Sequence, residues 1–328
     1  MKNIYTIPLI LLTLCNGANG QEKTQPTSYS WTISNPILEK GAKDSFDEIA
    51  VKDPSIVFYK NAWHLFYTAR GNNEYITAYA SAKNINELNS APRFELKQIR
   101  GKTRYGCAPQ IFFFTPQKKW YLIYQNRDSN YQPVFSTNIE IDNPNTWTAY
   151  QNLMEKDAKG KWIDFWVISD EERVYLFYTE GHNGVMVRST KTEDFPNNWS
   201  TSKKVISDIH EAVHVYKVID KREYHMIYEL NNNGVRSFGL AKAKHLEGPW
   251  TKVTDNYATE NQLNYTEDSE QWTEMVSHGE VIRIGYNQFL EYNPKSCKWL
   301  IQGINKNELD TDYPSLPWKL GIIEMNEK

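Results

Sequence analysis

A repeated pair of apolar segments organises most of the chain. In each copy, a short apolar run leads through a polar turn into a second run rich in Trp, Tyr and Phe, as in residues 53–59 followed by 63–67. The copies begin at Asp53, Pro109, Asp164, Glu211 and His278. Short runs separated by turn residues are typical of strands, and helical periodicity is nearly absent.

The spacing of the copies predicts how these strands assemble. Successive copies start about 47 to 67 residues apart, and four short strands with their turns need about 40–50 residues, the size of one propeller blade. We therefore predict an all-β fold, a five-bladed β-propeller, as a single domain over residues 21–328. A large β-sandwich is the alternative, but the regular repeats favour the propeller. The polar stretch 251–271 is expected to form a long surface loop.

The first twenty residues have the pattern of an export signal. Lys2 precedes an apolar run over residues 4–15, and Ala18-Asn19-Gly20 fits the small-x-small rule for cleavage. We expect a signal peptide at residues 1–20 and an exported protein, extracellular or periplasmic. A lipoprotein anchored through Cys15 ranks second, because Leu14 is large for the residue before an acylated cysteine. No run of 18 or more apolar residues occurs, so we expect no transmembrane segment.

Composition adds two constraints on the partners of this protein. Aromatic residues make up 14% of the 328 residues, and such residues suit strands and also line sugar-binding clefts. The net charge is −3 with no Lys/Arg-rich run, which argues against a nucleic-acid partner. Beyond the signal only Cys107 and Cys297 remain; they could pair, but they form no disulfide framework.

The repeats also predict where chemistry could take place. The first strand of each propeller blade lines the central channel, so the starts of the copies meet at one mouth. Asp53, Asp164, Glu211 and His278 would then converge on one axial pocket. Two carboxylates can act as acid and base, and a third can shift a neighbour's pKa. No single residue indicates a site by itself, since Asp-Pro is a common turn and a histidine is usually structural.

The other histidines indicate no second site. His64, His182, His214, His225 and His245 show no metal-ligand spacing among themselves, which favours structural roles. No Gly-rich phosphate loop, zinc motif or Gly-x-Ser-x-Gly elbow occurs.

Several longer segments match one enzyme family in order along the chain. They include Lys52-Asp-Pro-Ser-Ile-Val, Ala108-Pro-Gln-Ile-Phe-Phe-Phe, Trp162-Ile-Asp-Phe-Trp-Val-Ile-Ser-Asp170, Glu211-Ala-Val-His-Val-Tyr-Lys-Val218, Ser277-His-Gly-Glu-Val-Ile-Arg283 and Tyr313-Pro-Ser-Leu-Pro-Trp-Lys-Leu-Gly321. With these segments the chain resembles glycoside hydrolase family 62, the arabinoxylan α-L-arabinofuranosidases, over roughly residues 31–323.

The resemblance implies a role for each acid. Asp53 matches the general base of the family and Glu211 its general acid. Asp164 matches the acid that tunes the pKa of the general acid and orients the substrate. The family hydrolyses with inversion, and in that mechanism an acid and a base stand far enough apart to admit a water molecule. We therefore expect Asp164 to raise the pKa of Glu211 and to keep it protonated near neutral pH.

The resemblance also implies binding residues. The predicted substrate-binding residues are Lys52, Pro109, Gln110, Pro133, Tyr286 and Tyr313. His278 matches a histidine associated with a structural calcium ion at the propeller centre, whereas the chemistry itself requires no cofactor. The expected partner is plant cell-wall arabinoxylan, with arabinan as a second polymer, and the protein is expected to be a monomer.

Two departures from the family pattern bear on specificity. Pro314 follows the matched tyrosine where the family carries Asn, and Gln132 stands where a Trp precedes the proline. Both leave the three acids in place and put the preferred polymer in doubt. Two other functions stay open: a five-bladed glycosidase of the arabinanase or xylosidase type, and a carbohydrate-binding propeller without turnover.

Overall fold

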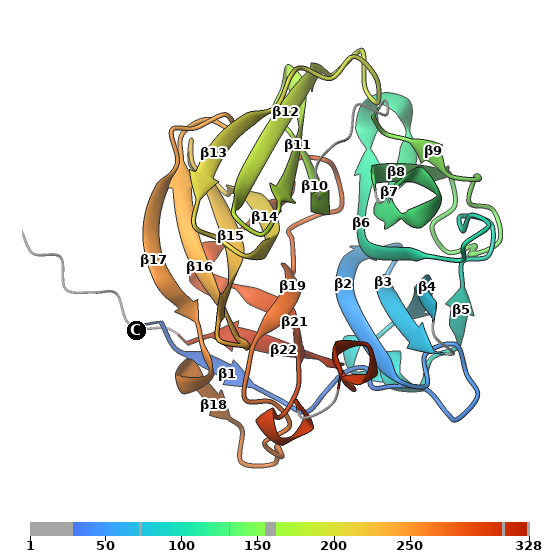
Figure 1. The fold of residues 1–328 in the computed structure, drawn as a ribbon, viewed down its shortest axis with the longest axis vertical. Coiled ribbons are helices and arrows are strands. Elements are labelled where there is room, and N and C mark those ends of the chain that lie inside the picture. The colour runs from blue at the N-terminus through green and yellow to red at the C-terminus, as the bar shows by residue number, and fades with distance from the viewer. Residues whose placement is uncertain (1–28, 72–73, 131, 155–161, 310–311, 327–328) are drawn as a thin grey trace, which may run out of the picture.

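Five sheets arranged around a central axis make up the protein (Figure 1). The computed structural model describes residues 29–71, 74–130, 132–154, 162–309 and 312–326. Within them the chain consists of strands, turns and short 3-10 helices, so the predicted five-bladed β-propeller is confirmed. The predicted signal peptide and Cys15 lie outside the described residues, and no described helix is long and apolar enough to cross a membrane.

Three blades follow the chain directly, each as four antiparallel strands from the axis outward. The first contains β2 (Ala50–Tyr59), β3 (Ala62–Gly71), β4 (Glu74–Ala82) and β5 (Arg93–Glu95). The second contains β6 (Gly106–Phe114), β7 (Lys119–Asn126), β8 (Gln132–Asn138) and β9 (Gln151–Asn152). The third contains β10 (Trp162–Ser169), β11 (Arg173–Glu180), β12 (Gly184–Lys191) and β13 (Lys203–Ser207).

The fourth blade corrects one expectation from the sequence. It contains β14 (Glu211–Val218), β15 (Tyr224–Asn232), β16 (Val235–Ala243) and β17 (Thr251–Ala258). The stretch 251–271, expected to be a loop, therefore holds an outer strand and also β18 (Leu263–Tyr265). Most residues of β17 are exposed or half-buried. Because neither face of most of this strand is buried, its sequence lacks the alternation of apolar and polar residues that marks a half-buried strand.

The fifth blade joins the two ends of the propeller. Its strands run from the axis outward as β19 (Ser277–Val281), β21 (Lys298–Gly303), β22 (Lys319–Met325), β1 (Trp31–Ile33) and β18. The N-terminal strand β1 pairs antiparallel with β22 and parallel with β18, so chain segments from both ends close the ring (Figure 1). Trp31 is fully buried, and its indole N–H donates a hydrogen bond of 2.8 Å to the Tyr257 carbonyl.

Residues 284–292, which we call the closing segment, cross the end of the propeller where the inner strands finish. Backbone N–H groups at the ends of β6, β10 and β14 donate to carbonyls of this segment: Phe113 to Tyr286, Ser169 to Gln288, and Lys217 to Leu290. Strand β20 (Glu291–Tyr292) pairs parallel with β14. In the sequence, residues 287–292 fall within the fifth copy of the repeat, which begins at His278, whereas the structure ties the closing segment to the second, third and fourth blades.

Short 3-10 helices connect the strands: η1 (Ile85–Ser90), η2 (Thr115–Gln117), η3 (Arg127–Ser129), η4 (Glu260–Gln262), η5 (Pro294–Ser296), η6 (Lys306–Glu308) and η7 (Tyr313–Ser315). The abundant aromatic residues mainly fill the space within and between blades; Trp120, Trp166, Trp299 and Trp318 are almost completely buried. Cys107 and Cys297 are both buried and free, so the two cysteines do not pair.

Because β1 closes the ring of blades, its buried Trp31 should contribute to the stability of the protein. Trp31→Ala should lower the free energy of unfolding by about 3–5 kcal/mol, because it removes a buried indole that packs on Tyr257 and Trp299. Guanidinium denaturation followed by far-UV circular dichroism measures this change. Ile139→Ala is the control, since its side chain is 74% exposed and a surface change is worth less than about 0.5 kcal/mol. Equal effects of the two substitutions would contradict the role of β1 in closure.

Candidate active site

A β-bulge recurs in the inner strand of every blade. The pairing register shifts after Lys52, Cys107, Ile163, Glu211 and Ser277. In four blades the next residue has a positive φ: Asp53 46°, Ala108 51°, Asp164 56° and Ala212 50°. Non-glycine residues rarely adopt this conformation, and Asp adopts it more readily than most. Because a bulge re-aims side chains, two consecutive residues of a strand can reach the same mouth of the channel.

These bulges line one cavity at the channel mouth, with a volume of about 400 Å³. Eight of its lining residues come from the bulges: Lys52, Asp53, Cys107, Ala108, Ile163, Asp164, Glu211 and His278. The predicted catalytic acids therefore lie in one pocket, together with Lys52, Tyr313 and His278. In two copies the alignment of the repeats predicted from the sequence is shifted by one residue. The structure places Ala108 and Ala212 at the position equivalent to Asp53, whereas the predicted copies begin at the neighbouring residues Pro109 and Glu211.

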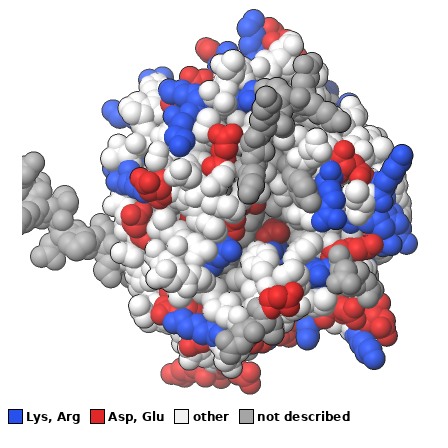
Figure 2. Space-filling view, viewed as in Figure 1, with Lys and Arg blue, Asp and Glu red and all other residues white. Residues whose placement is uncertain are grey.

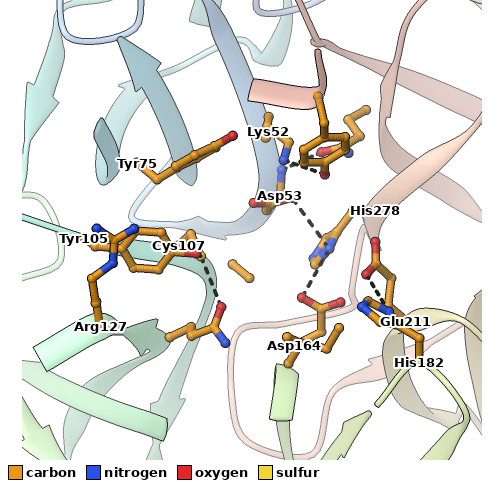
Figure 3. A pocket seen from close by; sticks show the side chains of 15 residues that line it. Lys52, Asp53, Tyr75, Tyr105, Cys107, Arg127, Asp164, His182, Glu211 and His278 are labelled. Carbon is orange, nitrogen blue, oxygen red and sulfur yellow. Dashed lines mark hydrogen bonds and ion pairs between the residues drawn. The ribbon is translucent and has the colours of Figure 1, made fainter. Parts of the chain in front are cut away.

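His278 lies between the two aspartates (Figure 3). Its Nδ1 is 3.6 Å from Oδ1 of Asp53 and 3.8 Å from Oδ1 of Asp164. The backbone N–H of Asp53 donates to Gln302 at 2.8 Å, and the backbone N–H of Ala212 donates to Asp164 at 2.8 Å. Contacts between blades therefore hold the backbone of Asp53 and the carboxylate of Asp164.

A buried ion-pair network holds Glu211. Arg236 lies between Glu211 and Glu229 and pairs with both carboxylates. Glu229 is fully buried and accepts hydrogen bonds from the Ser277 hydroxyl at 2.6 Å and the His278 backbone N–H at 2.9 Å. Since Ser277 and His278 belong to the fifth blade, this network links the fourth blade to the fifth directly behind the pocket.

The electrostatics of the acids differ from the expectation. Burial raises the pKa of Asp164 to about 6, with Glu211 and Asp53 adding to the rise against the opposing effect of His278. Burial also raises the pKa of Glu211, but the hydrogen bond from His182 and the charge of Arg236 outweigh it and hold that pKa well below its usual range. In the free protein, Asp164 therefore retains a proton more readily than Glu211.

Lys52 and Tyr313 form the rim on one side. The Lys52 ammonium donates a hydrogen bond of 2.9 Å to the Tyr313 hydroxyl and lies 4.7 Å from the centre of its ring. Burial lowers the pKa of Lys52, yet Asp53 and Tyr313 more than offset this and raise it above its usual value. Tyr313 is 45% exposed, so it presents a ring to solvent beside the acids. Pro314 accepts a hydrogen bond from Arg70 Nε at 3.0 Å through its carbonyl, which fixes η7 here.

Aromatic and polar side chains from the first two blades continue the wall from Lys52 (Figure 3). Tyr75, Tyr105 and Arg127 line it, and the Arg127 guanidinium lies 4.7 Å from the ring centre of Tyr105. Cys107 also faces the cavity, but burial raises its pKa to about 12, so the thiol stays protonated and is a poor nucleophile.

Four predicted binding residues do not line this pocket. Gln110 is fully buried and bridges to the backbone of Val167 in the third blade through both its amide atoms. Pro109 and Pro133 are buried within β6 and β8. Tyr286 lies in the closing segment, where its ring packs on Tyr59, Phe113 and Trp120 at the opposite end of the inner strands. A ring at that end of the channel cannot contact a sugar bound in this cavity.

Sequence reasoning also missed residues of the site. His182 was interpreted as structural, but it lines the pocket and its Nδ1 lies 3.3 Å from Oε2 of Glu211. Tyr75 lies at the start of the third strand of its blade, Tyr105 directly precedes β6 and Arg127 begins η3, so none of them lies in the apolar runs that the repeat marks. Glu229 did carry a signal, because it is an acid that follows the apolar run 224–228 of β15.

Carboxylates that surround one axial pocket of a five-bladed propeller have the arrangement of a glycoside hydrolase, which needs an acid and a base around a single bond. On the face shown in Figure 2, acidic and basic side chains are interspersed among uncharged residues.

The chain itself belongs to glycosyl hydrolase family 62, whose pattern it matches over residues 30–324.

Known proteins agree with this assignment. The chain is 31% identical over 310 residues to alpha-L-arabinofuranosidase C of Cellvibrio japonicus (strain Ueda107), covering 90% of this chain and 47% of the relative. It therefore spans about half the length of that relative. The catalytic domain of the Coprinopsis cinerea GH62 alpha-L-arabinofuranosidase is 32% identical with a TM-score of 0.85, covering 92% of this chain and 98% of that one. A GH62 hydrolase solved with xylotriose is 28% identical with a TM-score of 0.83, over 92% and 98% of the two chains.

The raised pKa of Asp164 predicts a pH-dependent cost in stability. An acid whose pKa is higher in the folded state than in the unfolded state destabilises the fold once it ionises. As the pH rises from 4 to 7, the unfolding free energy of the wild type should fall by up to about 3 kcal/mol relative to that of Asp164→Asn. This value corresponds to the rise of the Asp164 pKa from 3.8 to about 6 on folding. Asn tolerates the positive φ at this position. Urea denaturation at several pH values measures the difference.

The exposed Asp142 provides the matched control for this experiment. Asp142→Asn should follow the wild type at every pH. A difference between wild type and Asp164→Asn that stays constant from pH 4 to 7 would show that the Asp164 carboxyl is not destabilised by its surroundings.

Proposed function

We propose that this protein is an exported, exo-acting α-L-arabinofuranosidase that releases arabinofuranose side chains from arabinoxylan, and that it acts as a monomer. The observation that carries the proposal is the convergence of Asp53, Asp164 and Glu211 on one cavity in a chain of family 62. Two of the similar proteins are named as arabinofuranosidases, and a third was solved with xylotriose, a fragment of a xylan backbone.

The shape of the cavity supports an exo-acting enzyme. A volume of about 400 Å³ at the end of the channel suits one sugar unit. The polymer that carries this unit would lie across the mouth, where the exposed ring of Tyr313 offers a surface for it. An enzyme that cuts within a long chain needs an open groove along which the chain can pass in both directions.

The proposed reaction is a single displacement with inversion. Asp53, as the carboxylate, takes a proton from a water molecule, and the oxygen of that water forms a bond to the anomeric carbon. The bond from this carbon to the glycosidic oxygen breaks, and the carboxyl of Glu211 gives its proton to that oxygen. Asp164 and His278 hold the geometry beside Asp53. General acid and general base catalysis each contribute about 10²–10⁴ in rate.

Glu211 has to gain its proton for this step. In the free protein its carboxylate is stabilised by Arg236 and His182. A sugar in the pocket would replace water around the carboxylate, which lines the cavity. The loss of this water raises the pKa of Glu211, because it disfavours the charged form. Asp164, whose carboxyl is the more readily protonated of the two, is the competing candidate for the acid.

The catalytic assignment predicts the activity of two variants. Asp53→Asn and Glu211→Gln should each lower the release of arabinose from wheat arabinoxylan by about 10²–10⁴. Both substitutions keep the shape of the side chain, so the melting temperature should show a folded protein. The measurement is chromatography of the released sugars, with Asp142→Asn as the control. Proton NMR of the first product should show the inverted anomer.

Product analysis also separates the other functions. Shortened backbone or arabinan oligosaccharides would instead support an arabinanase or xylosidase type of enzyme. Binding to arabinoxylan without release of arabinose would support a carbohydrate-binding propeller. Wild-type rates in either variant would contradict the catalytic roles.

Substrates with different leaving groups distinguish Glu211 from Asp164 as the acid. An aryl arabinofuranoside with an acidic phenol as its leaving group needs little proton donation, whereas the alcohol of arabinoxylan needs much. The variant that lacks the acid should therefore retain far more activity on the aryl substrate than on the polymer. We expect this contrast for Glu211→Gln. The same contrast in Asp164→Asn, with none in Glu211→Gln, would assign the acid to Asp164.

A structural calcium ion at His278 is a further proposal that comes from the family resemblance. Calcium takes six to eight oxygen ligands, and the carboxylates that the described part of the chain places within 4 Å of His278 Nδ1 are those of Asp53 and Asp164. The protein donors alone do not fit a calcium shell, so water would have to complete it, and no catalytic step is derived from the ion. If calcium is held there, EGTA should lower the melting temperature and added Ca²⁺ should restore it. An unchanged melting temperature would remove calcium from the proposal.

A further inference from the structure

Two histidines and the proposed general acid form a compact cluster at the edge of the pocket. His182 comes from the turn between β11 and β12, and His210 directly precedes Glu211. The two imidazole rings stack with their centres 4.5 Å apart and their planes 19° apart. Nδ1 of His182 and Nε2 of His210 lie 3.3 Å and 3.7 Å from the same oxygen, Oε2 of Glu211.

The ligand atoms of this cluster have the spacing of a metal site. All three lie within 4.8 Å of one another, and no other group of three or more His, Cys, Asp or Glu residues in the described part of the chain does so. Zinc binds imidazole nitrogen and carboxylate oxygen at about 2.0–2.2 Å, which places neighbouring ligands of a tetrahedral ion about 3.3 Å apart. Small side-chain rotations are therefore enough to close the three atoms around one ion.

We propose that His182, His210 and Glu211 bind a divalent transition-metal ion of the zinc class, and that the bound ion excludes the substrate. Two imidazoles and one carboxylate suit Zn²⁺, Co²⁺, Ni²⁺ or Cu²⁺, whereas Ca²⁺ and Mg²⁺ prefer oxygen ligands. Three protein ligands leave a fourth position for water. Metal binding is independent of the proposed reaction, and only the exclusion of substrate rests on the proposed function.

The surrounding charges permit a cation at this place. Arg236 pairs with the other oxygen of Glu211, Oε1, so Oε2 remains directed at the histidines. The buried carboxylate of Glu229 also pairs with Arg236 and offsets its charge. The side chain of His182 is 47% exposed, which gives an ion from solution a path to the cluster.

A metal ion held here would block the reaction at its acid. Oε2 of Glu211 would be a metal ligand and could not carry the proton that the glycosidic oxygen receives. His182 and Glu211 also line the cavity itself, so a hydrated ion between them would occupy space that the sugar needs. Inhibition should therefore be competitive with substrate and reversible by a chelator.

Metal binding is tested on untagged protein that has been freed of metal with EDTA and dialysed. Calorimetric titration with ZnCl₂ should show one ion bound to the wild type, and Co²⁺ should give the intense visible absorption of a tetrahedral site. His182→Ala and His210→Ala should each weaken Zn²⁺ binding about tenfold or more, since each removes one of three ligands. His245→Ala, which removes an exposed imidazole from the fourth blade, is the matched control and should bind like the wild type. Absent binding to the wild type, or equal affinity in all variants, would overturn the site.

Inhibition is tested separately on arabinose release. Zn²⁺ should inhibit the wild type and His245→Ala, EDTA should reverse the effect, and Ca²⁺ at the same concentration should not inhibit. Each of the two ligand variants should resist Zn²⁺ relative to its own rate without metal. Zn²⁺ binding with unimpaired arabinose release would overturn the exclusion of substrate. A protein that releases no arabinose at all would overturn the proposed function and leave the metal titration to decide the site.

Discussion

The β-bulge in the inner strands is the constraint on which the site depends. In a regular strand, neighbouring side chains point to opposite faces, so only every second residue could face the channel mouth. The bulge breaks this alternation, and a residue with left-handed backbone at Asp53, Ala108, Asp164 and Ala212 turns the chain. Consecutive pairs such as Lys52 and Asp53 can therefore face the same cavity. Ala gains nothing from positive φ, so its presence at two of these positions shows that the turn is required by the fold of the blade.

The close approach of several buried acids determines the pKa values of the site. Each carboxylate loses water on burial, and only some of them receive a compensating cation. Glu211 receives one from Arg236, with a hydrogen bond from His182, whereas Asp164 has mainly an imidazole and one backbone N–H. The two pKa values therefore shift in opposite directions. Opposite pKa shifts of this kind are how neighbouring carboxyls take different protonation states within one site.

The sequence alone predicts the number of blades and the three acids, because both follow from repetition. An apolar strand, a turn and an aromatic strand recur often enough to count, and the first residues of the copies share a position. The sequence does not predict the exact register of the inner strands, because a bulge inserts one extra residue and no residue propensity indicates where. Pro109 was therefore aligned with Asp53 in place of Ala108. His182, Tyr105 and Arg127 reach the pocket from outside the repeated inner strands, where distant contacts decide the position of a side chain. The outer strand β17 was missed for the opposite reason: too few of its residues are buried to give a pattern.

The two ends of the channel explain why only one of them can be an active site. Within the channel, Arg283 donates to the carbonyls of Ile56 and Ile111 at 3.2 and 2.9 Å and pairs with Glu280 at 2.6 Å. Glu280 in turn accepts hydrogen bonds from Ser55 and from the backbone N–H of Ile56. This buried pair ties the first, second and fifth blades together and fills the channel below the acids, and the closing segment covers its far end. Removing one member would leave an unpaired buried charge, which costs more than the pair contributes. The buried pair and the closing segment therefore close this end of the channel, and the bulges of the different blades surround the one pocket at the open end that carries the acids.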